Sequence, residues 1–335
     1  MKKKIAVFIL LTLIIASFGF IIYKPPPIRV KIGYIPAASY GLIWIAYEKG
    51  YFNYEGLIVE LKEYPSTVQL AMALYNKEID GAPLTSVAVA AFIRRIDFVI
   101  VAGNSLDGTA LVSNRNFSRL EELSGKAIGT VQYVPGDFIF KNVFSQRNLN
   151  VTLKEYLTPA DALQALEGGY IEASLLWEPY VSLAEYRNLS IAFWDKQVNP
   201  KEYPCCLQVF LNSFIQSHPE AITKFIRALI KAEKLAYEKP NEAFPLIKKY
   251  LPTLPPEIVY KSIFYIDPTI NRPRNPISAY VDRDSLISFF SLLVPSIISH
   301  YDYSLLISKI NLSYYEKAIT SLRAEGFSLP NKYLR

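Results

Sequence analysis

The chain has 335 residues, about half of them apolar. This length and composition suit two domains with cores of their own and exclude an intrinsically disordered protein. The formal net charge of +6 is concentrated at one end, because Lys2, Lys3, Lys4 and Lys24 lie in or beside the N-terminal segment. The remaining 32 basic residues nearly balance the 30 acidic ones, so no nucleic-acid partner is expected.

The N-terminal segment has the features of a membrane-targeting sequence. After three lysines, residues 5–23 form an uncharged apolar run, about as long as a helix that crosses a ~30 Å hydrocarbon core. Residues 1–24 are therefore predicted to be a signal peptide or an N-terminal membrane anchor, and the bulky Phe18 and Phe20 favour the anchor because they leave no small-residue cleavage site. Residues 25–27 are prolines and form a stiff spacer. The lysines predict that the rest of the chain is extracytoplasmic, anchored at the cell surface.

The next hundred or so residues alternate between predicted strands and helices. Apolar runs and alternating patterns predict strands, and Ser or Thr before a periodic apolar stretch marks a helix start. In chain order we expect strand 28–35, helix 40–48, strand 57–64, helix 66–76, strand 79–82, helix 87–93 and strand 97–102. The same order starts again at Lys126. Such alternation is typical of mostly parallel sheets covered by helices, an α/β fold.

Short motifs at matching positions support this repeat. Ala73-Leu74 is followed by Ile79-Asp80, and Ala165-Leu166 is followed at the same spacing by Ile171-Glu172. An Ile-Gly pair lies upstream in each copy, at Gly33 and at Gly129. Asp80 and Glu172 are expected to be structural. Two similar lobes imply a cleft between them, where a small ligand binds.

The remaining part of the chain is predicted to be rich in helices. It contains strand 207–211 and helices at about 220–237, 241–250, 256–264, 282–299 and 312–325. It has no third copy of the repeated pattern, so this helical part must pack against one of the two lobes.

The sequence contains no motif that indicates catalysis, a cofactor or a metal. Cys205 and Cys206 are adjacent, which provides no disulfide framework, and we expect two small side chains in a strand. His218 and His300, the only histidines, lie at no metal-ligand spacing. Because G-x-S-x-G, P-loop and G-x-G-x-x-G patterns are absent as well, we expect a protein that is not an enzyme.

Loops at the carboxyl ends of the predicted strands provide candidate ligand contacts. Ligands of parallel α/β sheets bind at these ends, and helix N-termini there suit an anion. For the Ser and Thr residues, helix capping alone is an equally good explanation. The candidates in these loops are Ala38, Ser39, Tyr40, Ser66, Thr67, Thr85, Ser86, Asn104, Tyr133 and Asp137.

Five stretches in order resemble one family of transport proteins. They are KIGYIPAASYGLIWIAYEKGYFNYEGLIVEL, ALYNKEIDGAPLTSVAVAAF, LEELSGKAIGTVQY, ALEGGYIEASLLWEPYVSLAE and SHPEAITKFIRALIKAEKLAYEKPNEAF. The chain resembles the extracytoplasmic solute-binding proteins of nitrate/sulfonate/taurine-type ABC importers, whose relatives include proteins that bind thiamine-precursor pyrimidines. This resemblance implies a type II periplasmic-binding-protein fold that closes on a ligand and then docks on a membrane permease and its ATPase.

The resemblance also implies a division of the chain. Lobe 1 is expected to comprise residues 28–113 and 207–335, and lobe 2 residues 114–206, with crossings near Asn114 and Cys206. It further places Trp177-Glu178-Pro179-Tyr180 in a lobe 2 loop that faces the cleft, so Trp177 and Glu178 join the candidates.

Two classes of ligand stay open. A small oxyanion such as a sulfonate, nitrate or taurine would suit helix N-termini and hydroxyls, although the candidate loops contain no Arg or Lys. A flat pyrimidine would suit Tyr40, Tyr133 and Trp177 as stacking partners, with Asp137 or Glu178 as acceptors. An enzyme is the third hypothesis. Fungal pyrimidine synthases resemble this chain in fold and carry a cysteine-rich iron motif near the position of Cys205 and Cys206, but this chain lacks the other cysteines.

Overall fold

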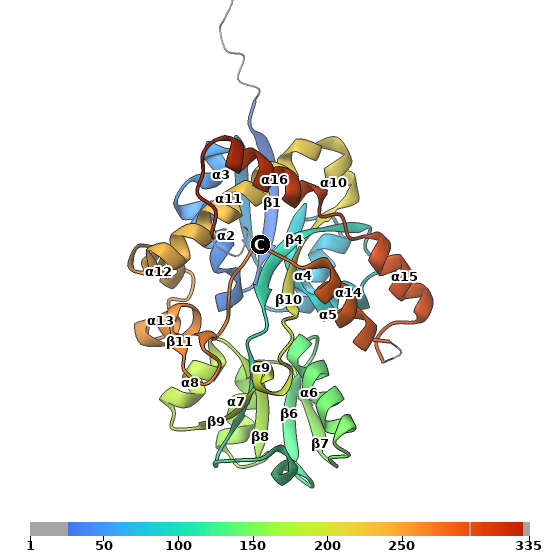
Figure 1. Ribbon diagram of the computed structural model, residues 1–335, viewed down its shortest axis with the longest axis vertical. Helices are drawn as coiled ribbons and strands as arrows, with labels where there is room; N and C mark the ends of the chain where they lie inside the picture. Colours follow the sequence, from blue (N-terminus) through green and yellow to red (C-terminus); the bar gives the residue numbers. More distant parts are fainter. Residues whose placement is uncertain (1–25, 295, 331–335) are drawn as a thin grey trace, which may run out of the picture.

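The computed structural model describes residues 26–294 and 296–330, which form two lobes stacked along the long axis (Figure 1). The predicted anchor at residues 1–24 lies outside the described residues. Among the residues that are described, no helix combines the length and the apolar character needed to cross a membrane.

Each lobe is built on a five-stranded sheet. The first sheet has the order β2 (Leu57–Glu63), β1 (Ile28–Tyr34), β3 (Gly81–Thr85), β10 (Pro204–Leu211) and β4 (Phe98–Leu106). The second has the order β7 (Thr152–Tyr156), β6 (Ala127–Val131), β8 (Ala173–Trp177), β5 (Thr109–Ser113) and β9 (Ser190–Trp194). The α/β two-lobe architecture expected from the sequence is therefore confirmed.

Both sheets are mixed, whereas the sequence predicted mostly parallel ones. β1 and β6 run parallel to both neighbours, but β10 runs antiparallel to β3 and β4, and β5 runs antiparallel to β8 and β9. β10 and β5 are the first strands after each lobe crossing. Because β10 and β5 enter their lobes from the boundary, they run away from it, whereas their neighbours in the sheet run toward it. The sheets are mixed for this reason.

The lobe boundary differs from the expected one at the first crossing. Because β5 pairs within the second sheet, the chain crosses at Asp107 and Gly108, between β4 and β5, and not near Asn114. Both residues have positive φ, 37° and 96°, which forms a tight turn. The second crossing lies between α9 (Asp195–Val198) and β10, just before Cys206.

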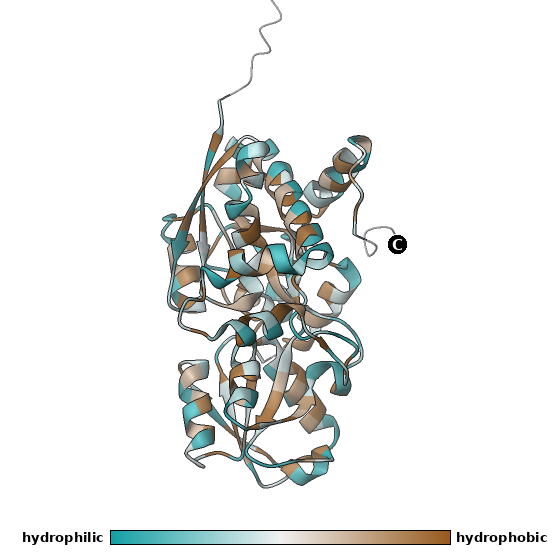
Figure 2. Cartoon of the chain, turned by 90° about the vertical axis from the view of Figure 1, so that its left-hand side faces the viewer, coloured by the Kyte–Doolittle hydropathy of each residue, from teal (hydrophilic) through white to brown (hydrophobic). Residues whose placement is uncertain are grey.

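Helices cover both sheets. The first lobe carries η1 (Ala38–Tyr40), α2 (Gly41–Glu48), α3 (Tyr51–Tyr54), α4 (Thr67–Tyr75), α5 (Ser86–Ala91), α10 (Asn212–Ser217), α11 (Pro219–Glu238), α12 (Pro240–Lys248), α14 (Arg283–Leu292), α15 (His300–Ser308) and α16 (Ser313–Ala324). The second lobe carries η2 (Leu120–Leu123), α6 (Pro135–Gln146), α7 (Pro159–Glu167), α8 (Tyr180–Tyr186) and α9. Figure 2 shows apolar colour along the strands of both lobes and much hydrophilic colour on the surrounding helices.

The helix expected over residues 282–299 is shorter in the structure. α14 ends at Leu292, shortly before Pro295 in the sequence, and the separate helix α15 follows from His300. A proline cannot donate the backbone hydrogen bond that a continuing helix requires. The sequence reading overlooked α15.

The repeated motifs have equivalent structural roles in the two lobes. The Asp80 carboxylate accepts a 2.7 Å hydrogen bond from the backbone N–H of Lys31 in β1, and the Glu172 carboxylate accepts one of 2.9 Å from Ala127 in β6. A side chain on Gly33 would come within 2.6 Å of Ile79, and one on Gly129 within 2.7 Å of Ile171. The repeat thus stabilises the start of each sheet, as expected for Asp80 and Glu172.

The C-terminal third also joins the lobes. α13 (Pro256–Phe264) packs against α8, and a short hairpin of β11 (Ile266–Asp267) and β12 (Arg272–Pro273) follows it (Figure 1). Arg272, the first residue of β12, forms a 2.9 Å ion pair with Asp107 at the first crossing. After the hairpin, the backbone of residues 276–279 bonds to that of β4. Besides its two crossings, the chain therefore has a third link across the lobe boundary.

Candidate functional site

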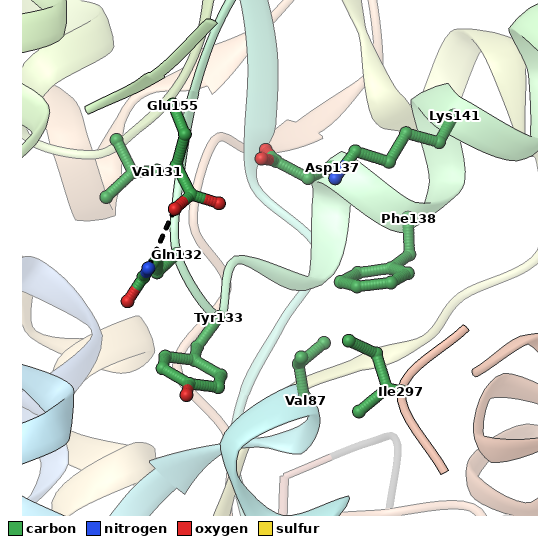
Figure 3. A pocket seen from close by; sticks show the side chains of 9 residues that line it. All are labelled: Val87, Val131, Gln132, Tyr133, Asp137, Phe138, Lys141, Glu155 and Ile297. Atoms are coloured by element: carbon green, nitrogen blue, oxygen red, sulfur yellow. Dashed lines mark hydrogen bonds between the residues drawn. The ribbon is translucent and has the colours of Figure 1, made fainter. Parts of the chain in front are cut away.

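A cavity of about 220 Å³ lies between the two lobes (Figure 3). The first lobe contributes one residue of α5 and one of the segment before α15, and the second lobe contributes the ends of β6 and β7 and the start of α6. The lining residues are Val87, Val131, Gln132, Tyr133, Asp137, Phe138, Lys141, Glu155 and Ile297. Two residues expected at the ligand site from the sequence, Tyr133 and Asp137, are among them.

The turn between β6 and α6 sets the geometry of this cavity. Tyr133 adopts φ 61°, a conformation that is uncommon outside glycine and often found at functional sites. Pro135 occupies the first turn of α6, where its fixed φ favours helix initiation. A side chain on Gly136 would come within 2.2 Å of Thr109, so glycine allows α6 to lie against β5. Asp137 therefore follows directly after a closely packed turn.

Asp137 is the most unusual group of the cavity. Its side chain is 2% exposed, and its Oδ1 atom has no hydrogen-bond partner among the described residues. Burial raises the pKa of Asp137 well above its usual range, and the nearby Lys141 charge opposes this shift only in part. A backbone hydrogen bond with Val131 also opposes the shift. A buried carboxyl oxygen without a partner costs stability unless something else satisfies it.

The other polar groups lie around Asp137 on the second lobe. Lys141 follows Asp137 by one turn of α6, and its ammonium lies 5.0 Å from the centre of the Phe138 ring. Gln132 donates a 2.7 Å hydrogen bond to the exposed carboxylate of Glu155 at the end of β7 (Figure 3). The cavity is thus lined by two carboxyl groups, of Asp137 and Glu155, and by one cation, Lys141.

Aromatic side chains bring the two lobes together beside the cavity. The Tyr133 ring lies 5.9 Å from the ring of Phe92, which caps the C-terminus of α5 in the first lobe. Tyr133 and Phe138 both pack against the core of the first lobe. Since Val87 and Ile297 come from that lobe, the wall opposite Asp137 is largely apolar.

The first loop contributes a buried network and not a cavity wall. Ser39 and Tyr40 are nearly inaccessible, and the Tyr40 hydroxyl donates a 3.0 Å hydrogen bond to the carbonyl of Pro83. Asn104 donates to the Ser39 carbonyl at 2.8 Å and accepts from Gln208 at 2.8 Å. Ala38 is fully buried beside them. These hydrogen bonds hold the loop after β1 against β3 and β4 of the first lobe.

The predicted Ser and Thr residues act at helix starts. The Ser66 hydroxyl accepts from Gln69 N–H and caps α4, in which Thr67 is the first residue. Thr85 accepts from Ala88 N–H and caps α5. The buried Ser86 hydroxyl finds no partner among the described residues and lies beside the cavity residue Val87. Capping therefore accounts for Ser66 and Thr85, and Ser86 retains an unused donor.

None of the residues of the WEPY motif lines this cavity. Trp177 is half-buried, packs against the core of the second lobe and contacts Tyr180 edge-on, with ring centres 6.1 Å apart. Glu178 is fully buried, accepts hydrogen bonds from Ser182 at 2.8 and 3.1 Å, and lies 3.7 Å from Arg274. Burial raises the pKa of Glu178, and the Arg274 charge opposes that rise. Glu178 thus joins the second lobe to the C-terminal third.

Three polar residues of the cavity were not among the candidates from the sequence, although two of them carried a signal. Lys141 follows Asp137 by four residues on one helix, a spacing that brings side chains together. Glu155 ends the strand next to β6, and parallel strands end at the same sheet edge. Gln132 directly precedes Tyr133 and had no signal of its own. In the described part of the chain, no group of three or more His, Cys, Asp or Glu side chains is placed to hold a metal.

The two lobes and their sheets define an α/β protein with the periplasmic-binding-protein fold. The sequence model of the NMT1-like family matches residues 23–245, so the chain belongs to the NMT1-like family. A comparison with curated proteins finds no match.

Solved structures of import-system proteins have the same fold. The nitrate-binding protein NrtA from Synechocystis has a TM-score of 0.73 at 15% identity, with 92% of each chain covered. A ligand-binding component of an ABC-type import system from Staphylococcus aureus scores 0.72 at 15% identity, covering 87% of this chain and 99% of that one. The alkanesulfonate-binding protein SsuA from Xanthomonas axonopodis, bound to MOPS, scores 0.69 at 15% identity, covering 86% and 100%. The resemblance inferred from the sequence is confirmed, and these neighbours are binding proteins rather than enzymes.

Proposed function

We propose that this protein is the extracytoplasmic solute-binding component of an ABC importer. It captures a small solute in the cavity between its lobes by hinge closure, and the closed form docks on a membrane permease with its ATPase. Residues 1–24 would hold it at the membrane. The observation that carries this proposal is a cavity lined by both lobes, with the buried carboxyl of Asp137, whose Oδ1 atom has no hydrogen-bond partner among the described residues, on its wall. A polar ligand in the cavity would supply the missing partner.

Among the oxyanions considered, a zwitterionic amino-sulfonate such as taurine suits the cavity best. Its ammonium would pair with Asp137 or Glu155, and its sulfonate with Lys141. A simple anion such as nitrate would gain only Lys141 and would lie beside two carboxyl groups. The cavity of about 220 Å³ is below the usual range for drug-sized ligands, which supports a compact solute.

A thiamine-precursor pyrimidine is the second candidate, because one observation favours it. The rings of Tyr133 and Phe138 both line the cavity, and a flat heteroaromatic ligand could stack on either. Its amino group would donate to Asp137. This ligand has no anionic group for Lys141, which is the feature that separates the two candidates.

Isothermal titration of the purified full-length protein tests the proposal. Taurine, ethanesulfonate and the aminopyrimidine precursor of thiamine present, respectively, both charges, the anion alone and a neutral amino group. We expect heat with taurine, and at least tenfold weaker binding of ethanesulfonate because its anion has no ammonium to offset the carboxyl groups. Heat with the pyrimidine alone would replace the first candidate by the second. Absence of heat with all three would contradict both.

Proton release provides a second measurement. Since the pKa of Asp137 is raised in the free protein, an ammonium bound beside it lowers that pKa and drives a proton off. Titrations with taurine in two buffers of different ionisation enthalpy should therefore show release of a proton. Asp137→Asn should lose both the release and most of the affinity. Asp161→Asn is the matched control, since Asp161 lies in the first turn of α7 but is exposed.

A further inference from the structure

The two cysteines of the chain form a close pair at the start of β10. Cys205 and Cys206 are adjacent, and their Sγ atoms lie 3.7 Å apart. The sequence contains no other cysteine. Cys206 is buried, whereas Cys205 is partly exposed.

A β-bulge explains why the two thiols meet. In a regular strand, successive side chains point to opposite faces of the sheet, which would separate neighbouring sulfur atoms. Here Pro204 pairs with Leu106 and Cys206 pairs with Ser105, so β10 advances by two residues while β4 advances by one. Cys205 is the extra residue of this bulge, and bulges commonly re-aim a side chain beside a functional site.

The pair lies where the chain enters the first lobe from the second. Tyr203, just before β10, is held from both crossings: its hydroxyl donates to Asp195 and its backbone N–H donates to Asp107 at 3.0 Å. Cys206 pairs with Thr85 of β3 on its other side. The thiols are therefore fixed in place by both neighbouring strands. The hydrogen bond between the two thiols lowers the pKa of Cys206 and raises that of Cys205 well above its usual range, and burial raises both. Cys205 is therefore the thiol that a small disulfide reaches first because of its exposure, and not because it is the more acidic of the two.

We propose that Cys205 and Cys206 form a thiol–disulfide exchange site that is oxidised by low-molecular-weight disulfides. The partly exposed Cys205 thiolate attacks one sulfur of the small disulfide, and one small thiolate leaves. The Cys206 thiolate, 3.7 Å away, then attacks the Cys205 sulfur and displaces the second small thiolate. Two protein thiols are oxidised to one internal disulfide, the small disulfide is reduced to two thiols, and the two protein protons pass to those thiols.

The product is expected to be reversible. Adjacent Cα atoms lie about 3.8 Å apart across a trans peptide, whereas disulfide-bonded residues usually have Cα atoms about 4.4–6.8 Å apart. A bond outside that range is more readily reduced than a structural disulfide, and labile disulfides of this kind are the regulatory ones. The site therefore suits a redox-sensitive modification at the lobe crossing rather than a permanent crosslink.

Intact mass measurement with oxidised glutathione tests the proposal on the full-length protein. The wild type should lose the mass of two hydrogens, retain no glutathione, resist labelling by a maleimide and return to the dithiol form with dithiothreitol. Cys206→Ser should instead keep one glutathione on Cys205, because the second thiol is absent. A wild type that keeps a stable mixed disulfide, or leaves both thiols free, would overturn the proposal.

A comparison with the unfolded chain tests the role of the bulge. In concentrated guanidinium chloride, the same oxidant should give at least threefold less internal disulfide and correspondingly more bound glutathione. An equal yield in the folded and unfolded chain would show that adjacency in sequence is sufficient, and the site could not be assigned to the fold. The wild-type measurement requires no variant, so it decides the question even if a cysteine substitution prevents folding.

Discussion

Arg274 is the residue whose loss should most weaken the link between the lobes. It is 3% exposed and donates to Asp267 at 3.0 Å, to Glu185 and to Ser182, while Glu178 lies 3.7 Å away. The guanidinium also lies over the rings of Trp194 and Tyr265, at 5.4 and 5.2 Å. Arg274→Met retains much of the side-chain volume but removes the cation from these carboxylates.

The expected loss follows from the burial of the partners. Glu178 is fully buried and the Asp267 side chain is 5% exposed, so the substitution leaves two buried carboxyl groups without the cation that they share. Removing one member of a buried ion pair typically costs about 3–5 kcal/mol in the free energy of unfolding. We expect a loss in this range, because Ser182 and Ser262 still donate to Glu178 but cannot neutralise it.

The pH dependence of this loss has a defined sign. Burial already raises the pKa of Glu178, and without Arg274 it should rise further. The folded variant then binds a proton that the unfolded chain releases above a pKa of about 4.3. Its stability should therefore increase, relative to the wild type, as the pH falls from 8 toward the unfolded-state value.

Urea unfolding at pH 8 and pH 5 measures both effects. Arg187→Met is the matched control, because the Arg187–Glu167 pair in the same lobe is exposed, with side chains 46% and 32% accessible. An exposed pair contributes about 0–1 kcal/mol. Adding Glu178→Gln to Arg274→Met should recover part of the loss. If Arg274→Met costs no more than the control, the buried network does not stabilise the fold as argued.

Three further predictions concern the lobe boundary and the second lobe. Burial raises the pKa of Asp107 to about 7, so the folded wild type binds a proton that the unfolded chain releases above a pKa of about 3.9. The stability of the wild type relative to Asp107→Asn should therefore rise as the pH falls from about 7 toward 3.9. A difference in unfolding free energy between the two proteins that is the same at pH 8 and pH 5 would contradict this. Gly103→Ala should destabilise by about 1–3 kcal/mol, since the new Cβ would lie 2.1 Å from the Tyr280 carbonyl oxygen. Urea unfolding measures this loss, and a free energy of unfolding equal to that of the wild type would contradict the clash. Trp177→Ala should lower the melting temperature and leave solute affinity unchanged, because Trp177 packs on the second-lobe core. Weaker solute binding with an unchanged melting temperature would instead support the ligand contact that the sequence predicted for Trp177.

The sequence alone was enough for the repeated part of the fold. Local patterns determine it: alternating and apolar runs specify strands, and hydroxyl residues such as Ser66 and Thr85 specify helix starts through hydrogen bonds to nearby N–H groups. The Ile-Gly and Ile-acid motifs recur because both lobes use the same two contacts: the isoleucine packs against the glycine, and the acidic side chain accepts a hydrogen bond from the first parallel strand. Tyr133 and Asp137 could be placed at the cavity because a strand end and a helix start are adjacent in the chain.

Only the tertiary structure decided the groups that meet across large separations. The direction of β10 and β5, the burial of Glu178 by Ser262 and Arg274, and the joining of Val87 and Ile297 to the second lobe depend on contacts between distant segments. The residues next to a side chain in the sequence do not show whether a distant segment covers that side chain or solvent does. Charge and burial, and hence the pKa of Asp137 and of Glu178, are therefore set by three-dimensional packing and not by the local sequence.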